Sequence, residues 1–286
     1  MIQKKIQIQN SLADFQDLTK SHLSIQVTLD GFTYCIFDKD LVDVVQLEEF
    51  EFDHRAQTPE QLLEFVHKIY EEEPILSKHY GSVNVTHKNN LSTIVPESLF
   101  EKEKEKEYLK YTVKVLETDA IAVDTLAENE TNNVYIPFDN INKFLEEKYG
   151  KFDFLHSSSI LVSSLLKYYK DEPGKLFFVN VAKNSFEIVF IEDNKLQFHN
   201  TFLYYTKEDF LYYILFTMEQ LFLDTETQKL TFLGAIDKKS PLFDITYTYV
   251  RYIDFLKVNN FSLSEEFYEM NPHVEKHYFF ELLNQF

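Results

Sequence analysis

The chain has 286 residues, 44% of them hydrophobic, so it is long enough to bury a substantial core. Its formal net charge of −19 excludes the basic footprint that nucleic acid or an anionic membrane surface requires. The one cysteine, Cys35, excludes an internal disulfide and fits a reducing compartment, so we expect a cytoplasmic protein with basic or uncharged protein partners, no membrane insertion and an oligomeric state that composition does not fix.

The first predicted element of the core is a meander of three strands. It covers residues 23–50, where apolar residues alternate along the chain and Asp30-Gly31 marks a turn. Residues 1–22 precede it as a leader, which we expect to add an edge strand at residues 6–9.

A helix with a clear start signal follows the meander. Thr58 is the expected N-cap, Pro59 suits the first helical position, and Gln61 completes a capping box. The apolar positions keep helical spacing as far as Tyr70. A further strand is predicted at residues 82–86.

The block between Ser98 and Gly150 is predicted to be a subdomain inserted in the first half. Its mixed-charge run at residues 101–107 is typical of a solvated helix face. Strands and one helix are predicted in the rest of the block, at residues 111–116, 120–126, 133–137 and 139–149. A strand at residues 152–156 and a helix at 157–169 then close this half, with the serine run 157–159 as the expected helix cap.

The second half of the chain repeats the order of elements of the first. Its meander lies at residues 176–201, and Thr206 opens an apolar helix that is too short to span a bilayer. We therefore predict an α/β fold with two duplicated lobes, residues 1–172 and 173–286, each a mixed sheet with a three-stranded meander flanked by helices. Five pairs of residues are predicted to hold equivalent places: Val27 and Val181, Phe32 and Phe186, Thr58 and Thr206, Val85 and Leu233, and Asp153 and Asp254.

Two such lobes in one chain resemble the actin-like (RNase H-like) superfamily of actin, sugar kinases, the Hsp70 ATPase domain and bacterial pilus and cell-division ATPases. More closely, the stretches LSIQVTLDGF and VNVTHKNNLS and the helix from Thr206 to Leu223 resemble a bacterial family of uncharacterised actin-like-fold proteins, domain-of-unknown-function family 3822. The resemblance implies two actin-like lobes around a cleft. It implies no particular activity.

The resemblance also implies where a nucleotide would bind, because active members carry an Asp-x-Gly turn in each meander that holds phosphates and magnesium. On that pattern Gln26 stands at the aspartate of the first meander and Thr28 at the glycine. In the second meander Asn180 stands at the aspartate, Ala182 at the glycine and Ser185 at the hydroxyl. Amides offer no charge to a divalent cation, so the phosphate loops are expected to be degenerate and no cofactor is expected.

Two further features bear on the same cleft. The glycine pair that packs on adenosine would fall at Gly234 and Ala235, where one glycine remains. A shift of register offers Asp30 and Gly31 as the phosphate turn, although this pair is also an ordinary hairpin turn. ATP with magnesium is therefore an alternative that we do not favour.

Other chemistries find little support in the sequence. The chain has only five glycines, and their positions allow no Walker loop, Rossmann fingerprint or GxSxG elbow. His273 and His277 have the spacing that lets two side chains share a metal ion, but no third ligand is indicated, so we expect no metal site. His87 and His156 end strands at positions that can face the cleft between the lobes, but lone histidines are usually structural or solvent-exposed, and nothing pairs these two with a nucleophile.

The leading hypothesis is a non-catalytic scaffold or regulatory binding protein. The alternative is a nucleotide-dependent enzyme, an ATPase or small-molecule kinase, that uses Asp30, Asn180 or Asp237 in unorthodox roles.

Overall fold

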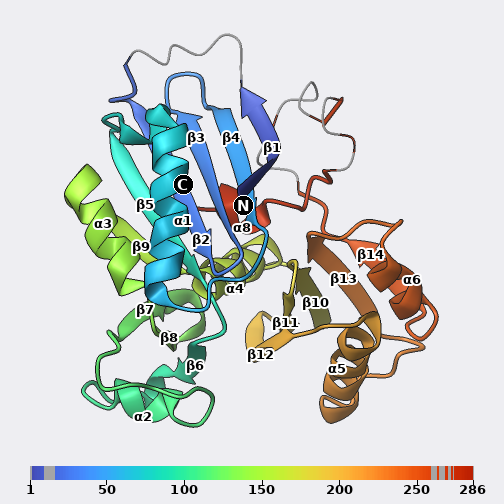
Figure 1. Cartoon of the computed structure of the whole chain (residues 1–286). Coiled ribbons are helices and arrows are strands. Elements are labelled where there is room, and N and C mark those ends of the chain that lie inside the picture. The colour runs from blue at the N-terminus through green and yellow to red at the C-terminus, as the bar shows by residue number, and fades with distance from the viewer. Residues whose placement is uncertain are drawn as a thin grey trace.

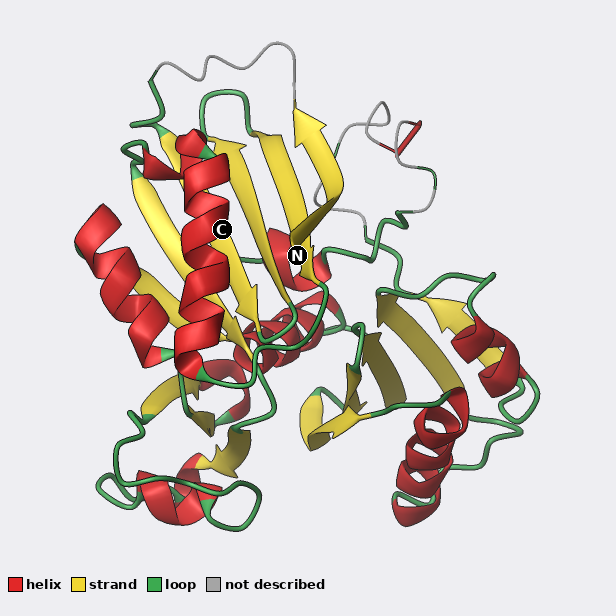
Figure 2. Ribbon diagram, viewed as in Figure 1, coloured by secondary structure: helices red, strands yellow, loops and turns green. Residues whose placement is uncertain are grey.

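The structure, a computed structural model, describes residues 2–9, 17–258, 263, 268, 269, 272 and 274–285. Its two larger sheets belong to two lobes that lie side by side, and a smaller sheet extends below the first lobe (Figure 1). Helices flank the sheets of both lobes (Figure 2). This is the two-lobed α/β architecture that the order of predicted elements indicated.

The first lobe is built on a six-stranded mixed sheet. Its strands are β1 (Ile2–Gln9), β2 (Ser21–Thr28), β3 (Gly31–Asp38), β4 (Asp43–Phe52), β5 (Ser82–Lys88) and β9 (Asp153–His156). They lie in the order β1-β4-β3-β2-β5-β9. The meander β2-β3-β4 is antiparallel, and β5 and β9 continue the sheet in parallel. The expected N-terminal edge strand is present and pairs with β4.

The second lobe repeats this sheet without the N-terminal strand. Its strands are β10 (Lys175–Val181), β11 (Ser185–Glu192), β12 (Lys195–Leu203), β13 (Lys229–Gly234) and β14 (Tyr252–Phe255). Their order, β12-β11-β10-β13-β14, matches β4-β3-β2-β5-β9 strand for strand, with the same parallel and antiparallel pairings.

The two meander hairpins also share their register. Val27 lies opposite Phe32 in the first hairpin, and Val181 lies opposite Phe186 in the second. The predicted correspondence of these four residues is therefore confirmed in the sheets.

The predicted correspondence further along was wrong by one residue. Val85 lies opposite Ile25, whose equivalent in the second lobe is Val179. Leu233 lies opposite Asn180 instead, one residue further along the strand. The equivalent of Val85 is Phe232, which lies opposite Val179 and faces the core beneath the helices. Because strand side chains alternate between faces, a shift of one residue had assigned Leu233 to the wrong face.

Each sheet is covered on one face by helices of its own lobe. In the first lobe these are α1 (Pro59–Glu72) and α3 (Asp139–Tyr149), and in the second they are α5 (Lys207–Gln220) and α6 (Pro241–Tyr247) (Figure 1). No helix in the described part of the chain has the length and apolar character needed to cross a membrane.

The starts of α1 and α5 follow the predicted caps with one difference. The Thr58 hydroxyl accepts a hydrogen bond from the Gln61 amide at 3.2 Å, but the Gln61 side chain accepts from the Gln57 amide rather than from Thr58. At α5, Thr206 and Asp209 form a complete capping box. Both helices are thus fixed by local hydrogen bonds that the sequence specifies.

The opposite face of the second sheet is covered by a helix from the first half of the chain. Helix α4 (Ser157–Tyr168) follows β9 directly, yet its side chains pack in a cluster with β10 and β11, for example Leu161 with Val189. The chain thus crosses between the lobes at the start of α4.

The C-terminal segment, residues 274–285, makes the reciprocal crossing. It contains α8 (Phe280–Leu283), follows the second lobe, and packs on the first sheet, where Leu282 clusters with Cys35 and Leu47. Helices α4 and α8 contact each other between the lobes. The predicted division at residue 173 is therefore crossed in both directions, and the C-terminal segment forms part of the space between the sheets.

The small sheet begins earlier and ends earlier than the predicted insertion. It consists of β6 (Ser92–Pro96), β8 (Thr131–Tyr135) and β7 (Ala122–Leu126), with the short α2 (Glu105–Leu109) beside it. Helix α3 packs in the core of the first lobe instead. The predicted range 98–150 was therefore wrong at both ends, because β6 pairs with β8 across a long separation and α3 packs beside α1.

Two local predictions inside this half are also corrected. Residues 111–116 form a turn and irregular chain rather than a strand. The cap of α4 is the His156 side chain, which accepts a hydrogen bond from the Ser158 amide at 3.1 Å, whereas the serine run 157–159 lies inside the helix and is buried. His87 is buried and hydrogen-bonds Asn142 at 2.9 Å, a structural role as expected.

Candidate functional site

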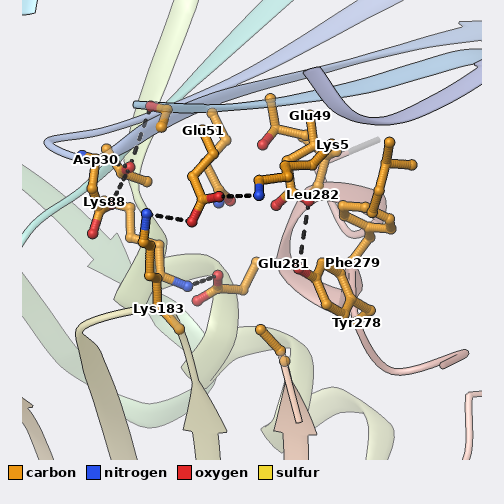
Figure 3. Close-up of a pocket in the computed structure, with 18 of the residues that line it drawn as sticks. Lys5, Asp30, Glu49, Glu51, Lys88, Lys183, Tyr278, Phe279, Glu281 and Leu282 are labelled. Carbon is orange, nitrogen blue, oxygen red and sulfur yellow. Dashed lines mark hydrogen bonds and ion pairs between the residues drawn. The ribbon is translucent and has the colours of Figure 1, made fainter. Parts of the chain in front are cut away.

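A pocket of about 330 Å³ lies between the two lobes (Figure 3). Strands β2, β3 and β4 form one wall, the turn after β10 and the end of β13 form a second, and the C-terminal segment forms a third. A smaller cavity of about 40 Å³ adjoins it and shares the side chains of Thr28, Asp30, Lys88, Asn180 and Ala182. The crossing of the chain between lobes therefore creates the site.

All nine residues predicted for the nucleotide cleft lie at these two cavities. Eight line the larger pocket: Gln26, Thr28, Asp30, Gly31, Asn180, Ala182, Gly234 and Ala235. Ser185 lines the smaller one. Gln26 and Asn180 hold equivalent places in the two hairpins, because Gln26 lies opposite Thr33 and Asn180 lies opposite Glu187. The duplicated meanders thus bring one amide side chain from each lobe to the same space.

The two hairpin turns contact each other directly. The Asn184 amide group donates a hydrogen bond to Asp30 Oδ2 at 2.9 Å, and the Thr28 hydroxyl donates to Asp30 Oδ1 at 2.7 Å. Lys183, in the same turn as Asn184, forms an ion pair with Glu51 of β4. Both oxygens of Asp30 are therefore occupied by donors of the protein, and Asp30-Gly31 serves as a hairpin turn that links the lobes.

Gly234 is needed for close packing of the second sheet. A Cβ atom at this position would lie 2.2 Å from the Val181 carbonyl oxygen and 2.6 Å from Asn180 Oδ1, and the backbone has φ +80°. The next residue, Ala235, donates its amide to the Val181 carbonyl at 2.7 Å. The glycine is thus explained by the approach of β13 to β10 and of its backbone to Asn180.

A buried network of charged and polar groups joins the lobes behind these turns. Lys88 at the end of β5 forms an ion pair with Glu281 of α8 (Figure 3). Asn180 donates to Glu281 Oε1 at 2.9 Å and lies 3.2 Å from Glu187 Oε2. Glu187 also accepts from the Ser158 hydroxyl at 2.5 Å. One lysine therefore faces two buried carboxylates that come from different parts of the chain.

The two carboxylates of this network differ in their pKa. Burial raises the pKa of Glu281, and the charge of Glu187 adds to the rise while Lys88 opposes it. Burial would also raise the pKa of Glu187, but its hydrogen bond with His199 and the charge of Lys88 outweigh burial and hold the pKa below its ordinary value. His199 and Lys88 together thus keep Glu187 ionised, whereas Glu281 is prone to protonation.

Glu49 of β4 faces the same pocket and has a raised pKa. Burial raises it to about 7, with a smaller contribution from the charge of Glu51, against the hydrogen bond from Tyr278 and the charges of Lys5 and Lys88. The Tyr278 hydroxyl lies 3.4 Å from Glu49 Oε2. Glu49 is thus a half-buried carboxylate without a direct ion pair among the described residues.

The raised pKa of Glu49 predicts a pH-dependent stability. The ordinary value is 4.5, so the contribution of Glu49 to the free energy of unfolding falls as pH rises from about 4.5 to about 7. Glu49→Gln should therefore raise the free energy of unfolding by about 2 kcal/mol at pH 8 and by roughly half as much or less at pH 5.5. Urea denaturation followed by circular dichroism measures both values.

The matched control for Glu49→Gln is Glu64→Gln, which removes an exposed charge on α1. It reports how the loss of one surface charge affects this acidic protein. An equal effect of Glu49→Gln at both pH values would contradict the assignment.

The residues that complete this site were not predicted. The strand predicted at residues 82–86 ends short of Lys88, and Glu49, Glu187 and Glu281 were not considered. Glu187 carried a usable signal, because it interrupts the otherwise apolar run of β11, where a charge is costly unless it is paired. Glu281 carried none, because only the crossing of the C-terminal segment brings it between the lobes.

A metal site finds no support in the described part of the chain, which contains no group of three or more His, Cys, Asp or Glu side chains arranged to hold an ion. Of the histidine pair considered from the sequence, His273 lies outside the described residues. His277 is buried and bonds the Ile236 carbonyl at 2.9 Å, so it helps to attach the C-terminal segment to the second lobe.

Two lobes of the same strand order, with crossing helices and a pocket between the hairpin turns, define the actin-like ATPase fold. A Bacteroides thetaiotaomicron VPI-5482 protein, described as having an actin-like ATPase fold and unknown function, aligns with a TM-score of 0.77 at 23% identity over 86% of this chain and 94% of its own. A chain of the PilM–PilN type IV pilus biogenesis complex aligns with a TM-score of 0.61 at 10% identity, over 92% of this chain and 96% of its own.

Residues 10–253 match the family described as "Protein of unknown function (DUF3822)", and the chain belongs to this family. No curated protein matches the sequence. At 23% and 10% identity the two solved structures establish the fold alone.

Proposed function

We propose that this protein is a non-catalytic scaffold or regulatory binding protein that uses the actin-like fold for recognition rather than for ATP hydrolysis. The observation that carries the proposal is the direct contact of the two hairpin turns, in which Asn184 donates to Asp30 at 2.9 Å. In active members of the superfamily the phosphates lie between these turns. Here the turns bind each other.

The charges of the pocket support the same proposal. Gln26 and Asn180 offer neutral oxygens where a hydrated magnesium ion needs charged ones. Lys5 and Lys183 are both paired with Glu51, and Lys88 is paired with Glu281, so the three lysines of the pocket already neutralise carboxylates. A triphosphate would have to compete with these carboxylates for every lysine in the pocket.

A protein partner is the second part of the proposal. The PilM–PilN structure is a complex between proteins, and its actin-like chain has the same fold as this one. The net charge of −19 favours a partner with a basic surface, because complementary charge speeds encounter and selects among partners.

The test is thermal unfolding of the purified protein with and without ATP, ADP and magnesium, together with phosphate release. We expect no change in the melting temperature and no turnover above buffer. A ligand at 100 times its Kd would add about 2.7 kcal/mol of stability, which such an experiment detects readily. A magnesium-dependent increase in the melting temperature, abolished by Asp30→Ala, would overturn the proposal and favour the nucleotide-dependent enzyme.

A further inference from the structure

Three oxygen-bearing side chains form a row across the sheet wall of the pocket. Gln26 of β2 lies opposite Thr33 of β3, and Thr33 lies opposite Glu49 of β4. Directly opposite side chains in an antiparallel sheet share a face, with Cβ atoms about 5 Å apart. All three residues line the pocket of about 330 Å³. The row therefore presents an amide oxygen, a hydroxyl and a carboxylate to the same space.

Few hydrogen-bond donors of the protein reach the side chains of this row. Gln26 Oε1 is buried and has no hydrogen-bond partner among the residues that the structure describes. Glu49 has the Tyr278 hydroxyl at 3.4 Å, a long contact for a carboxylate. The three lysines that line the pocket are paired with Glu51 and Glu281 instead. Buried acceptors are stable only when donors reach them, so a ligand that brings donors and positive charge would complete this wall.

Apolar side chains adjoin the row. Phe279 and Leu282 of the C-terminal segment line the pocket (Figure 3), and Ile6 of β1 lies opposite Glu49 in the sheet and also lines it. The volume of about 330 Å³ lies at the lower end of the roughly 300–1,000 Å³ that small-molecule sites have. The pocket thus combines an acceptor-rich row with apolar side chains, at the size of a small organic molecule.

We propose that this pocket binds a small primary amine, whose ammonium group is held by Glu49, Thr33 and Gln26 and whose apolar body lies against Phe279 and Leu282. An ammonium group carries three N–H donors and one positive charge, which match three acceptors of which one is a carboxylate. Its charge favours ionised Glu49, so amine binding and release of the Glu49 proton are linked. The proposal rests on the proposed function, since it assigns an organic cation to a cleft that does not hold magnesium nucleotide.

The experiment compares 2-phenylethylamine with its neutral analogue 2-phenylethanol by thermal unfolding and by calorimetric titration at pH 8. The two probes have the same apolar body and differ in the ammonium group. We expect the amine to raise the melting temperature by a few degrees when it is well above its Kd, and the alcohol to leave it unchanged. Equal effects of the two probes, or no effect of the amine, would overturn the proposal.

Glu49→Gln is the decisive variant, because it keeps the shape of the side chain and removes its charge. We expect it to weaken amine binding at least tenfold, while Glu64→Gln on α1 leaves the affinity unchanged. Retained affinity in Glu49→Gln would overturn the assignment of the ammonium site even if the amine binds. Circular dichroism establishes that each variant is folded.

The outcomes also separate this proposal from the proposed function. Magnesium-ATP is titrated into the same samples as the amine. A response to magnesium-ATP overturns the non-catalytic assignment whatever the amine does. A response to neither ligand overturns the amine site alone and leaves the non-catalytic assignment supported.

Discussion

Replacing Lys88 by methionine should lower the free energy of unfolding by about 3–5 kcal/mol, because it leaves the buried Glu281 carboxylate without its cation. Lys88 is largely buried and is paired with Glu281, and its charge, together with the contact of His199, keeps Glu187 ionised. Methionine keeps most of the side-chain volume, so the loss reports charge rather than a cavity. Urea denaturation followed by circular dichroism is the measurement, since the chain has no tryptophan.

Two further variants separate the buried pair from ordinary surface charge. Lys20→Met breaks the exposed pair of Lys20 with Asp40 and should change the free energy of unfolding little, because water screens this pair. In the double variant Lys88→Met/Glu281→Gln, the second change removes the carboxylate that lost its partner, so much of the stability should return. A loss for Lys88→Met no larger than that for Lys20→Met would show that the pair does not hold the lobes together.

The fold could be predicted from the sequence because its signals are local. Alternating apolar residues mark the meanders, and Thr58 and Thr206 mark the starts of α1 and α5 through hydrogen bonds within four residues. The repeated order of elements then limits the architecture to two similar lobes. The family resemblance gave the same result from the stretches that form β2 and β5.

The exact boundaries depended on contacts that are distant in sequence. Strand β6 is recognisable only through its pairing with β8, about 40 residues away by the register of Val95 with Asn132. The crossing of α4 and of the C-terminal segment to the opposite lobe follows from packing, not from local pattern. These are the features that determine which side chains reach the pocket.

In the candidate site, too, some residues could be predicted from local sequence patterns, whereas others depend on contacts that are distant in sequence. The hairpin residues Gln26 and Asn180 could be placed together, because the family resemblance assigns each of them to the same position of its meander, and the strand register agrees. The ion pair of Lys88 with Glu281 joins residues 193 positions apart, and no periodicity relates them. The amides of the hairpins were therefore predictable, whereas the charges that surround them were not.

The replacement of Gly234 is expected to cause a second large loss of stability at the same site. Gly234→Ala should lower the free energy of unfolding by roughly 2–5 kcal/mol, since the backbone has φ +80° and the new Cβ would lie 2.2 Å from the Val181 carbonyl oxygen. Gly174→Ala is the matched control. Gly174 has φ +96° but nothing within 4 Å of the added Cβ, so this substitution should cost only the backbone term of about 1–2 kcal/mol.

The difference between the two glycine variants isolates the packing of β13 against β10. If Gly234 were retained for a ligand that approaches its backbone, its replacement would weaken ligand binding and leave stability close to that of Gly174→Ala. If it is retained for the contact with Val181 and Asn180, as the geometry indicates, the loss of stability appears without any ligand. Urea denaturation of the two variants in ligand-free buffer decides between these readings, because the packing role requires Gly234→Ala to be the less stable by at least about 1 kcal/mol.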